Sequence, residues 1–432
     1  MSTVRPRNDE GADGEHSGTI RKEQPPFLTK LSYAGYMYGL KSILVPLFWL
    51  REWKETRNPP EGHPDIVKTY KCRPHLPVRI FFPSSYDQTS PATLPALFTI
   101  HGGGFCLGHQ RDDDEWNRTF ADTHSVLVIS LNYSKAPTYP FPTAPHDIEA
   151  LVLAALEDAS LPIDRSAHAP ASRTAILGFS AGGNLALSVS QLPAIRNHPL
   201  APRAAISVYG CLDLSVPPHE KLQNRPYKPA LRPPRGNPNT STSNNSNRTD
   251  PLLGLAPAFD WSYVPYGQDL RDPLLSPHHY ADRADLPPFV CIVASELDML
   301  AHESWRTACR LSREGGNVRR AVPDRRSADA PWRICGDPDG RVISRRGELI
   351  GLLPAREDER YAFEETYYPG GRGGRASGGV KWLLVPDVLH GFDNPHIRAL
   401  MGGTEAIKDA ELKTEAYMTE LARWLKEVVW QL

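Results

Sequence analysis

The chain has 432 residues, 40% of them hydrophobic, and a formal net charge of -1 at pH 7. This length and composition allow a large buried core, either in one α/β domain with insertions or in two domains. The near-neutral charge gives no bulk attraction to nucleic acid or to an anionic membrane, so neither is indicated as a partner.

The six cysteines form no CxxC pair and show no metal-ligand spacing. Cys106 and Cys291 lie in or beside apolar runs, which predicts small buried residues. Reduced thiols in an intracellular protein are the simplest interpretation of this usage.

Residues 1–24 are polar and charged, which predicts a disordered N-terminus. They contain no apolar core behind a basic start. We therefore expect no secretory signal and a cytoplasmic protein.

The stretch Pro25–Trp53 has apolar positions around much of a helix, which predicts a helix buried on more than one side. Its apolar part, Tyr36–Leu50, contains Lys41 and Pro46. A membrane span needs about 20 apolar residues, so this part is too short. We interpret it as a helix that covers a pocket or packs on the domain, with a peripheral membrane contact as the alternative.

Short apolar runs of strand length alternate with stretches of helical spacing from residue 76 onward. The predicted strands are Leu76–Phe82, Pro95–Ile100, Ser125–Leu131, Thr174–Leu177, Ala204–Val208, Phe289–Ala294 and Val380–Val385. The predicted helices are Asp147–Leu156 and, at the C-terminus, about Glu405–Val429. This alternation indicates parallel βαβ units with right-handed crossovers, and so an α/β fold with a mostly parallel twisted sheet.

Two stretches interrupt the alternation. Residues 216–247 are dense in proline, asparagine and serine, which predicts a surface loop. Residues 315–379 are rich in arginine and glycine and are predicted to be a solvated insertion, with a β-hairpin over residues 332–344. Acidic residues are interspersed there and no aromatic stacking pattern accompanies the arginines, so a nucleic-acid surface is not indicated.

The apolar run at Thr174–Leu177 leads into Gly178-Phe179-Ser180-Ala181-Gly182, a Gly-x-Ser-x-Gly motif, and then into a small-residue helical pattern. Such a sharp strand-to-helix turn can hold a serine hydroxyl above a sheet. Glycine is required at 178 and 182 because a Cβ would crowd the neighbouring strand and helix. The motif alone does not separate a nucleophile from an ordinary Gly/Ser turn, so Ser180 needs partners elsewhere in the chain.

The stretch His101-Gly102-Gly103-Gly104 follows a predicted strand. A serine nucleophile needs backbone N–H groups that stabilise the negative oxygen of the tetrahedral intermediate, and losing one typically costs ~3 kcal/mol. We predict Gly103 and Gly104 as donors, with Gly102 as an alternative and the amide of Ala181 as a further donor. His101 is expected to brace this loop through a hydrogen bond.

A serine hydroxyl also needs a histidine base, which position must select among 15 histidines. His390 follows the last predicted strand and is the predicted base. Asp298, after the strand Phe289–Ala294, is the predicted orienting acid, with Glu296 as the nearby competitor. The resulting chain order is Ser, Asp, His. Three other histidines have no such context and are expected on the surface: His278, His279 and His302.

Together these motifs resemble the hormone-sensitive-lipase group of α/β-hydrolases, especially its fungal esterase-like members. The stretches that carry the resemblance are His101–Phe105, Tyr133–Pro142 with Asp147 behind it, Gly178–Gly183, Asp272–Pro277, Asp298–Leu300 and His390–Phe392. The resemblance implies a catalytic domain over about 75–430, a helical cap segment over 25–60, and serine esterase activity on a small-molecule ester. It implies Ser180 as nucleophile, His390 as base and Asp298 as its partner, with Asp147 in support and with no cofactor and no metal.

The chain also departs from this family. Ser134, Lys135 and Thr138 stand where the family usually has arginine, leucine and glutamate, so local hydrogen bonding is expected to differ. His302 stands where a second acid is common. His390 lies 92 positions after Asp298, a longer connection than relatives typically use, so residues 315–379 are expected to loop out.

We therefore predict a serine hydrolase that cleaves a carboxylic ester through an acyl-enzyme. A second interpretation uses the same residues in a lactonase, thioesterase, amidase or acyltransferase that acts on a secondary metabolite, since acyl chemistry is common to all. A third is a non-catalytic ligand-binding protein, against which His390 argues. The oligomeric state is left open.

Overall fold

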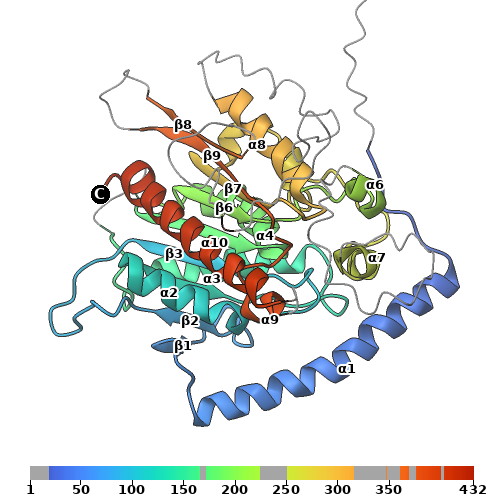
Figure 1. The fold of residues 1–432 in the computed structure, drawn as a ribbon, viewed down its shortest axis with the longest axis horizontal. Helices are drawn as coiled ribbons and strands as arrows, with labels where there is room; N and C mark the ends of the chain where they lie inside the picture. Colours follow the sequence, from blue (N-terminus) through green and yellow to red (C-terminus); the bar gives the residue numbers. More distant parts are fainter. Residues whose placement is uncertain are drawn as a thin grey trace, which may run out of the picture.

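The computed structural model describes residues 19–165, 172–223, 251–315, 347, 361–368, 376–399 and 403–432. Within these ranges a nine-stranded sheet is covered by helices on both faces (Figure 1). The predicted α/β fold with a mostly parallel sheet is thereby confirmed.

The strands follow one another across the sheet in the order β1-β2-β4-β3-β5-β6-β7-β9-β8. Their bounds are β1 Ile66–Lys68, β2 Val78–Phe81, β3 Ala96–Ile100, β4 Leu127–Leu131, β5 Thr174–Phe179, β6 Ala204–Val208, β7 Phe289–Ser295, β8 Ala362–Tyr367 and β9 Gly378–Val385. The pairs β1–β2, β2–β4 and β8–β9 at the two edges are antiparallel, and the inner pairs are parallel. The inner strands are buried on both faces, which explains why they are continuous apolar runs in the sequence.

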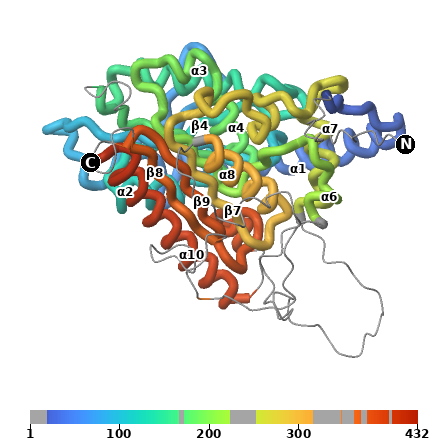
Figure 2. The backbone as a smooth tube through the Cα atoms, turned by 90° about the horizontal axis from the view of Figure 1, so that it is seen from above, coloured from blue at the N-terminus to red at the C-terminus, as the bar shows by residue number. Residues whose placement is uncertain are grey.

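Successive residues of a strand point alternately into two hydrophobic layers, one on each face of the sheet. Phe98 points to the layer formed with α3 (Thr143–Glu157), α4 (Ala181–Ser190) and α8 (Ala301–Gly315). Its neighbour Leu97 points to the opposite layer, formed with α2 (Asp114–His124) and α10 (Thr404–Arg423). Figure 2 shows α3 and α10 on opposite sides of the strands. Besides α1, the other α-helices of the described ranges are α5 Pro193–Arg196, α6 Pro218–Gln223, α7 Pro251–Tyr263 and α9 Pro395–Arg398.

Helix α1 (Phe27–Arg57) forms where a helix was predicted, but its predicted burial on more than one side is wrong. Met37 is its buried residue, and most of its large apolar side chains are exposed. The helix lies beside α7, with the Tyr33 and Trp261 rings 6.4 Å apart (Figures 1 and 2). That this segment serves as a cap stays a prediction. No helix in the described ranges combines the length and apolar character needed to cross a membrane.

The boundaries of the predicted irregular segments need correction where the structure describes them. Residues 20–22, predicted to be disordered, make backbone hydrogen bonds with residues 267–270. Residues 218–223 form α6 instead of the start of a loop. Residues 362–367, predicted to lie in a solvated insertion, form the edge strand β8, whose backbone groups pair with β9. The predicted hairpin at 332–344 lies outside the described residues.

Two of the three histidines expected on the surface are buried. His302 on α8 and His278 in the turn at Pro277–His279 are buried, whereas His279 is partly exposed. The ring nitrogen Nδ1 of His278 lies 2.8 Å from Thr307 Oγ1. Burial lowers the pKa of His278 to about 3, although the carboxylate of Asp213 opposes that shift. The surface prediction failed because it used the absence of a motif in place of evidence on burial.

We predict that His278 makes the protein less stable in acid. Its folded-state pKa is about 3, whereas an unfolded histidine has a pKa near 6.5, so below pH 6.5 the unfolded chain binds the proton more tightly. His278 should therefore make the unfolding free energy about 2 kcal/mol lower at pH 5 than at pH 7.5. His278→Asn keeps a polar group near Thr307 but does not titrate.

Urea titrations at pH 7.5 and pH 5 measure the effect for the wild type and this variant. The wild type should lose about 2 kcal/mol more than His278→Asn on acidification, because other titrating groups act equally in both proteins. Equal losses would contradict a buried neutral His278.

Candidate active site

The Gly-x-Ser-x-Gly stretch forms the turn between β5, which ends at Phe179, and α4, which begins at Ala181. Ser180 itself has φ 55° and ψ -115°, a conformation that side-chain-bearing residues rarely adopt. A Cβ on Gly178 would lie 1.9 Å from the Gly182 carbonyl oxygen, and one on Gly182 would lie 2.0 Å from the Ile100 carbonyl oxygen. The sequence needs glycine at both positions because the turn brings backbone into direct contact with backbone.

The structure brings Ser180, His390 and Asp298 into one hydrogen-bonded chain. Ser180 Oγ lies 2.8 Å from His390 Nε2, and His390 Nδ1 lies 2.6 Å from Asp298 Oδ2. The second carboxylate oxygen of Asp298 accepts the backbone N–H of Leu300 at 3.0 Å. The carboxylate is buried and acceptor-only, so the His390 proton lies on Nδ1 and Nε2 is free to accept from the serine hydroxyl.

The other acid in this loop, Glu296, points elsewhere. One of its carboxylate oxygens accepts the backbone N–H of Asp387 at 2.9 Å, and the other accepts the hydroxyl of Tyr361 at 3.3 Å. Glu296 is fully buried and ties the loop after β7 to the loop after β9. Of the two predicted candidates, Asp298 is therefore the one that contacts His390.

The three residues meet because each follows a strand at the same edge of the sheet. Ser180 follows β5, Asp298 follows β7 and His390 follows β9, and these strands run parallel. The carboxyl ends of parallel strands share one edge, which is where open α/β sheets bind ligands.

The glycine loop after β3 lies against this turn. A Cβ on Gly102 would lie 3.3 Å from Ser180 Cβ, so the loop and the serine are in direct contact. Gly103 and Gly104 have φ of 111° and 59°, which only glycine adopts easily. On its far side the loop meets α7, because a Cβ on Gly104 would lie 2.3 Å from the ring of Phe259.

His101 braces the loop from behind. Its Nδ1 lies 2.7 Å from the Gly102 carbonyl oxygen, and its ring stacks on Tyr133 at 4.5 Å between centroids. The Tyr133 hydroxyl donates to the same carbonyl at 3.2 Å. Burial and the neighbouring Lys135 lower the pKa of His101 well below its ordinary value, so the ring is neutral.

Asp147 supports the next loop along the chain. One carboxylate oxygen accepts the backbone N–H of Ser134 at 2.9 Å, and the other accepts the Arg73 guanidinium at 2.5 Å. Arg73 supplies a guanidinium in the neighbourhood of position 134, where the related family usually has arginine and this chain has Ser134. Asp147 thus acts on the structure of this loop, through Ser134 and Arg73.

Sequence reasoning missed the groups behind His390. The Tyr209 ring lies 4.8 Å from the imidazole, and its hydroxyl donates to Asp393, which also accepts from Tyr417. Burial raises the pKa of the Asp393 carboxyl. The sequence offered one signal for this cluster, which is that Asp393 lies three residues after His390. Tyr209 and Tyr417 come from remote segments and carry no local motif.

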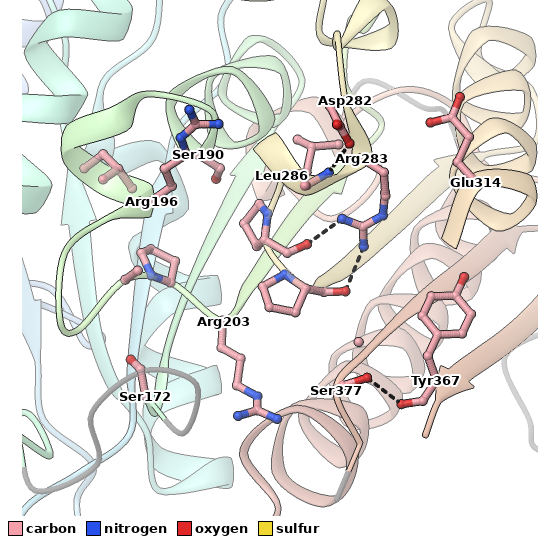
Figure 3. A pocket seen from close by; sticks show the side chains of 17 residues that line it. Ser172, Ser190, Arg196, Arg203, Asp282, Arg283, Leu286, Glu314, Tyr367 and Ser377 are labelled. Atoms are coloured by element: carbon pink, nitrogen blue, oxygen red, sulfur yellow. Dashed lines mark hydrogen bonds between the residues drawn. The ribbon is translucent and has the colours of Figure 1, made fainter. Parts of the chain in front are cut away.

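A separate cavity of about 610 Å³ lies at the other end of the strands, away from Ser180 (Figure 3). Its lining includes Arg203, Pro288 and Ser377, which immediately precede β6, β7 and β9. Arg283, also in the lining, donates to the carbonyl oxygens of Pro287 and Pro288 at 2.8 and 2.7 Å. The cavity therefore lies at the amino ends of the strands whose carboxyl ends hold the candidate site.

Metal binding finds no support in the described ranges. They hold no group of three or more His, Cys, Asp or Glu side chains arranged to bind a metal ion. Cys106 and Cys291 are buried free thiols, as predicted.

Comparisons with known proteins agree on one fold. A family model described as alpha/beta hydrolase fold matches residues 97–323. An ethyl acetate hydrolase of Pseudomonas putida is 31% identical over 268 residues, which cover 61% of this chain and 74% of that protein. An arylesterase of Saccharolobus solfataricus is 28% identical over 244 residues, covering 56% of this chain and 68% of the relative. An esterase structure from Pyrobaculum calidifontis has a TM-score of 0.52 at 19% identity, covering 94% of this chain and 99% of that one, which shows the fold alone.

We predict that Gly178→Ala disrupts the turn around Ser180. The added methyl group would overlap the Gly182 carbonyl oxygen, so β5 and α4 must separate and the unfolding free energy should fall by at least about 2 kcal/mol. Gly254→Ala is the matched control, because a Cβ on this glycine of α7 meets nothing within 4 Å and should stabilise the helix by up to about 1 kcal/mol. Urea unfolding measures both variants, and similar stabilities would refute the crowding argument.

Proposed function

Because this chain belongs to the α/β-hydrolase fold family, in its hormone-sensitive-lipase group, we propose that it is a serine esterase that cleaves carboxylic esters through an acyl-enzyme. The observation that carries the proposal is the continuous hydrogen-bonded chain from Asp298 through His390 to Ser180. The arylesterase and the ethyl acetate hydrolase described above are both ester hydrolases by name, which supports the same reaction.

In the first step, Ser180 Oγ attacks the carbonyl carbon of the ester while His390 Nε2 takes the hydroxyl proton. The imidazolium that forms is held by Asp298, whose carboxylate accepts from Nδ1 and stabilises the positive charge. His390 then returns the proton to the leaving alcohol as the tetrahedral intermediate collapses to the acyl-enzyme.

The negative oxygen of the intermediate is assigned to backbone N–H groups at Gly103, Gly104 and Ala181, with Gly102 as the alternative donor. Support for Gly103 comes from its peptide bond, since the carbonyl at the other end of that bond, on Gly102, accepts hydrogen bonds from His101 and Tyr133. Accepting two hydrogen bonds polarises the peptide and strengthens its N–H as a donor. Donors held in place before the reaction are the largest electrostatic contribution in this class of chemistry.

In the second step, water replaces the alcohol. His390 takes a proton from the water as it attacks the acyl carbonyl and then returns a proton to Ser180 Oγ, which releases the carboxylic acid. Two relatives carry the names ethyl acetate hydrolase and arylesterase, which favour simple carboxylic esters, whereas others carry the name arylacetamide deacetylase, which describes amide cleavage. The same residues would perform lactone, thioester or amide cleavage by the same steps, and a substrate panel separates these outcomes.

Ser180→Ala should abolish ester hydrolysis while leaving the fold intact. We expect kcat for p-nitrophenyl acetate, butyrate and octanoate to fall by about 10⁴-fold or more, because no nucleophile remains. The acyl chain that the wild type prefers measures the size of the acyl pocket in the same assay. A fluorophosphonate probe should label the wild type and leave the variant unlabelled.

Ser190→Ala is the matched control, because this serine lies on the same helix α4 and donates only to the Ala186 carbonyl oxygen in the described contacts. It should retain turnover and labelling. Wild-type-like turnover by Ser180→Ala would refute the mechanism, and a folded wild type that neither labels nor hydrolyses any ester would favour a binding protein.

A further inference from the structure

Helix α1 presents large apolar side chains that nothing in the described chain covers. Eleven of them have relative exposures between 47% and 76%, and we call this set the apolar ridge: Phe27, Leu28, Leu31, Tyr36, Tyr38, Ile43, Val45, Leu47, Trp49, Leu50 and Trp53. A contiguous apolar surface of this kind on a globular protein marks an interaction site.

Helix geometry gathers the ridge on one side. At 3.6 residues per turn its members occupy roughly 200° of the circumference of α1. The other exposed positions on that arc up to Leu50 are small and uncharged: Ser32, Gly35, Gly39, Ser42 and Pro46. The charged residues between Phe27 and Leu50 are Lys30 and Lys41, and both lie on the opposite arc.

The opposite arc holds the domain. Met37 is buried there, Tyr33 packs near Trp261, and Lys41 Nζ donates to the carbonyl oxygen of Ala136. Further along, Arg51 Nη1 lies 3.2 Å from Asp112 Oδ1. These contacts fix the rotation of α1 about its axis, so the ridge faces away from the domain.

We propose that the apolar ridge docks on the surface of a lipid bilayer, with α1 lying in the plane of the interface. The width of the ridge favours a bilayer over a second copy of this chain, because a helix–helix seam is narrower than the stripe of about 100° or more that a core-facing helix buries. The ridge contains Tyr36, Tyr38, Trp49 and Trp53, and such amphipathic rings prefer the headgroup level of a membrane.

Charge at the end of the helix agrees with this orientation. Lys54 and Arg57 are exposed just beyond the ridge, where they can meet anionic headgroups. The arc of α1 that holds the ridge is uncharged up to Leu50 and supplies the apolar contact, so binding should depend mainly on the ridge and less on lipid charge.

The test is flotation of the full chain with phosphatidylcholine vesicles, with and without phosphatidylserine. Wild-type protein should float with both vesicles, and more strongly with phosphatidylserine. Ile43→Ser/Trp49→Ser, which removes two ridge side chains remote from the domain contacts, should lower the partition coefficient at least about tenfold on both.

Val67→Ser/Tyr266→Ser is the matched control, because these apolar side chains have similar exposure but lie on β1 and in the loop after α7. It should bind vesicles like the wild type. Absence of wild-type binding, or equal loss in both double variants, would overturn the proposal. So would a dimer in solution that the ridge variant dissociates without any vesicle binding, measured by light scattering.

A second observation concerns Lys135, which stands where the related family usually has leucine. Its Nζ lies 3.0 Å from His101 Nε2, 2.8 Å from Asn132 Oδ1 and 3.8 Å from the centroid of the Tyr133 ring. Both His101 nitrogens face an acceptor, with Nδ1 2.7 Å from the Gly102 carbonyl oxygen and Nε2 3.1 Å from Asn132 Oδ1. Asn132 Oδ1 already accepts from Lys135 and from the Tyr133 backbone N–H, so in the neutral ring we place the proton on Nδ1, and Nε2 accepts. Lys135 supplies the donor that this tautomer requires, whether or not its amine is charged.

The geometry points to Lys135 as a positioning residue for the glycine loop, acting through His101 on the Gly102–Gly103 peptide. This inference rests on the proposed function, because it concerns the backbone donors assigned to the negative oxygen. Without Lys135, the ring can rotate or change tautomer, and the Gly102 carbonyl loses a fixed donor.

Steady-state kinetics on p-nitrophenyl butyrate test this role. Lys135→Met should lower kcat about tenfold with KM within about twofold, since the loop acts mainly in the transition state. Lys135→Arg retains a donor of similar reach and should recover most of the lost kcat. Lys413→Met is the control, because Lys413 is also buried but pairs with Asp409 on α10. It should lower the thermal midpoint and leave kcat unchanged.

The outcomes separate the two proposals. An inactive wild type would refute the esterase function itself. An active wild type with unchanged kcat in Lys135→Met, or with equal loss in both lysine variants, would overturn the role of Lys135 alone.

Discussion

Contact between backbone and backbone at the turn after β5 is the constraint on which the site depends. The Gly182 carbonyl occupies the space where a side chain on Gly178 would lie, and the Ile100 carbonyl does the same for Gly182. Strand β3, the turn and helix α4 are therefore closer than any side chain would permit. Because β3 continues directly into the glycine loop, the contact that fixes Ser180 also fixes the loop beside it. The serine and the glycine loop, whose backbone N–H groups are the proposed donors, are thus one rigid unit.

Much of this unit could be predicted from the sequence because its determinants are local. The apolar runs indicate buried parallel strands, and in such a sheet the residues after the strand ends meet at one edge. Together with the Gly-x-Ser-x-Gly motif, that reasoning selected Ser180 and His390. It placed Asp298 first and kept Glu296 as the competitor, because both follow β7 within one short loop. The choice depends on remote groups, since the backbone N–H of Asp387 and the hydroxyl of Tyr361 engage Glu296.

The main feature of the site that could not be predicted from the sequence is compensation between distant residues. The loss of an arginine at position 134 suggested altered hydrogen bonding, and the structure shows Arg73 bonded to Asp147 nearby. Helical periodicity has a similar limit, because it shows which residues share a face and not whether anything covers that face. Helix α1 is apolar around most of its circumference, which in an isolated sequence is typical of a buried helix. Its exposure follows from the domain, which offers contacts to one arc only.

Helix α7 contacts both helix α1 and the glycine loop beside Ser180. One of its side chains, Trp261, faces Tyr33 of α1, and another, Phe259, lies against Gly104 of the glycine loop. The space beside Gly104 is too small for a Cβ while Phe259 is in place, so the loop conformation and the position of α7 are coupled. The position of α7 is in turn coupled to α1 through the Tyr33–Trp261 contact. A surface that holds α1 in place therefore acts on α7, and α7 is in direct contact with the glycine loop beside Ser180.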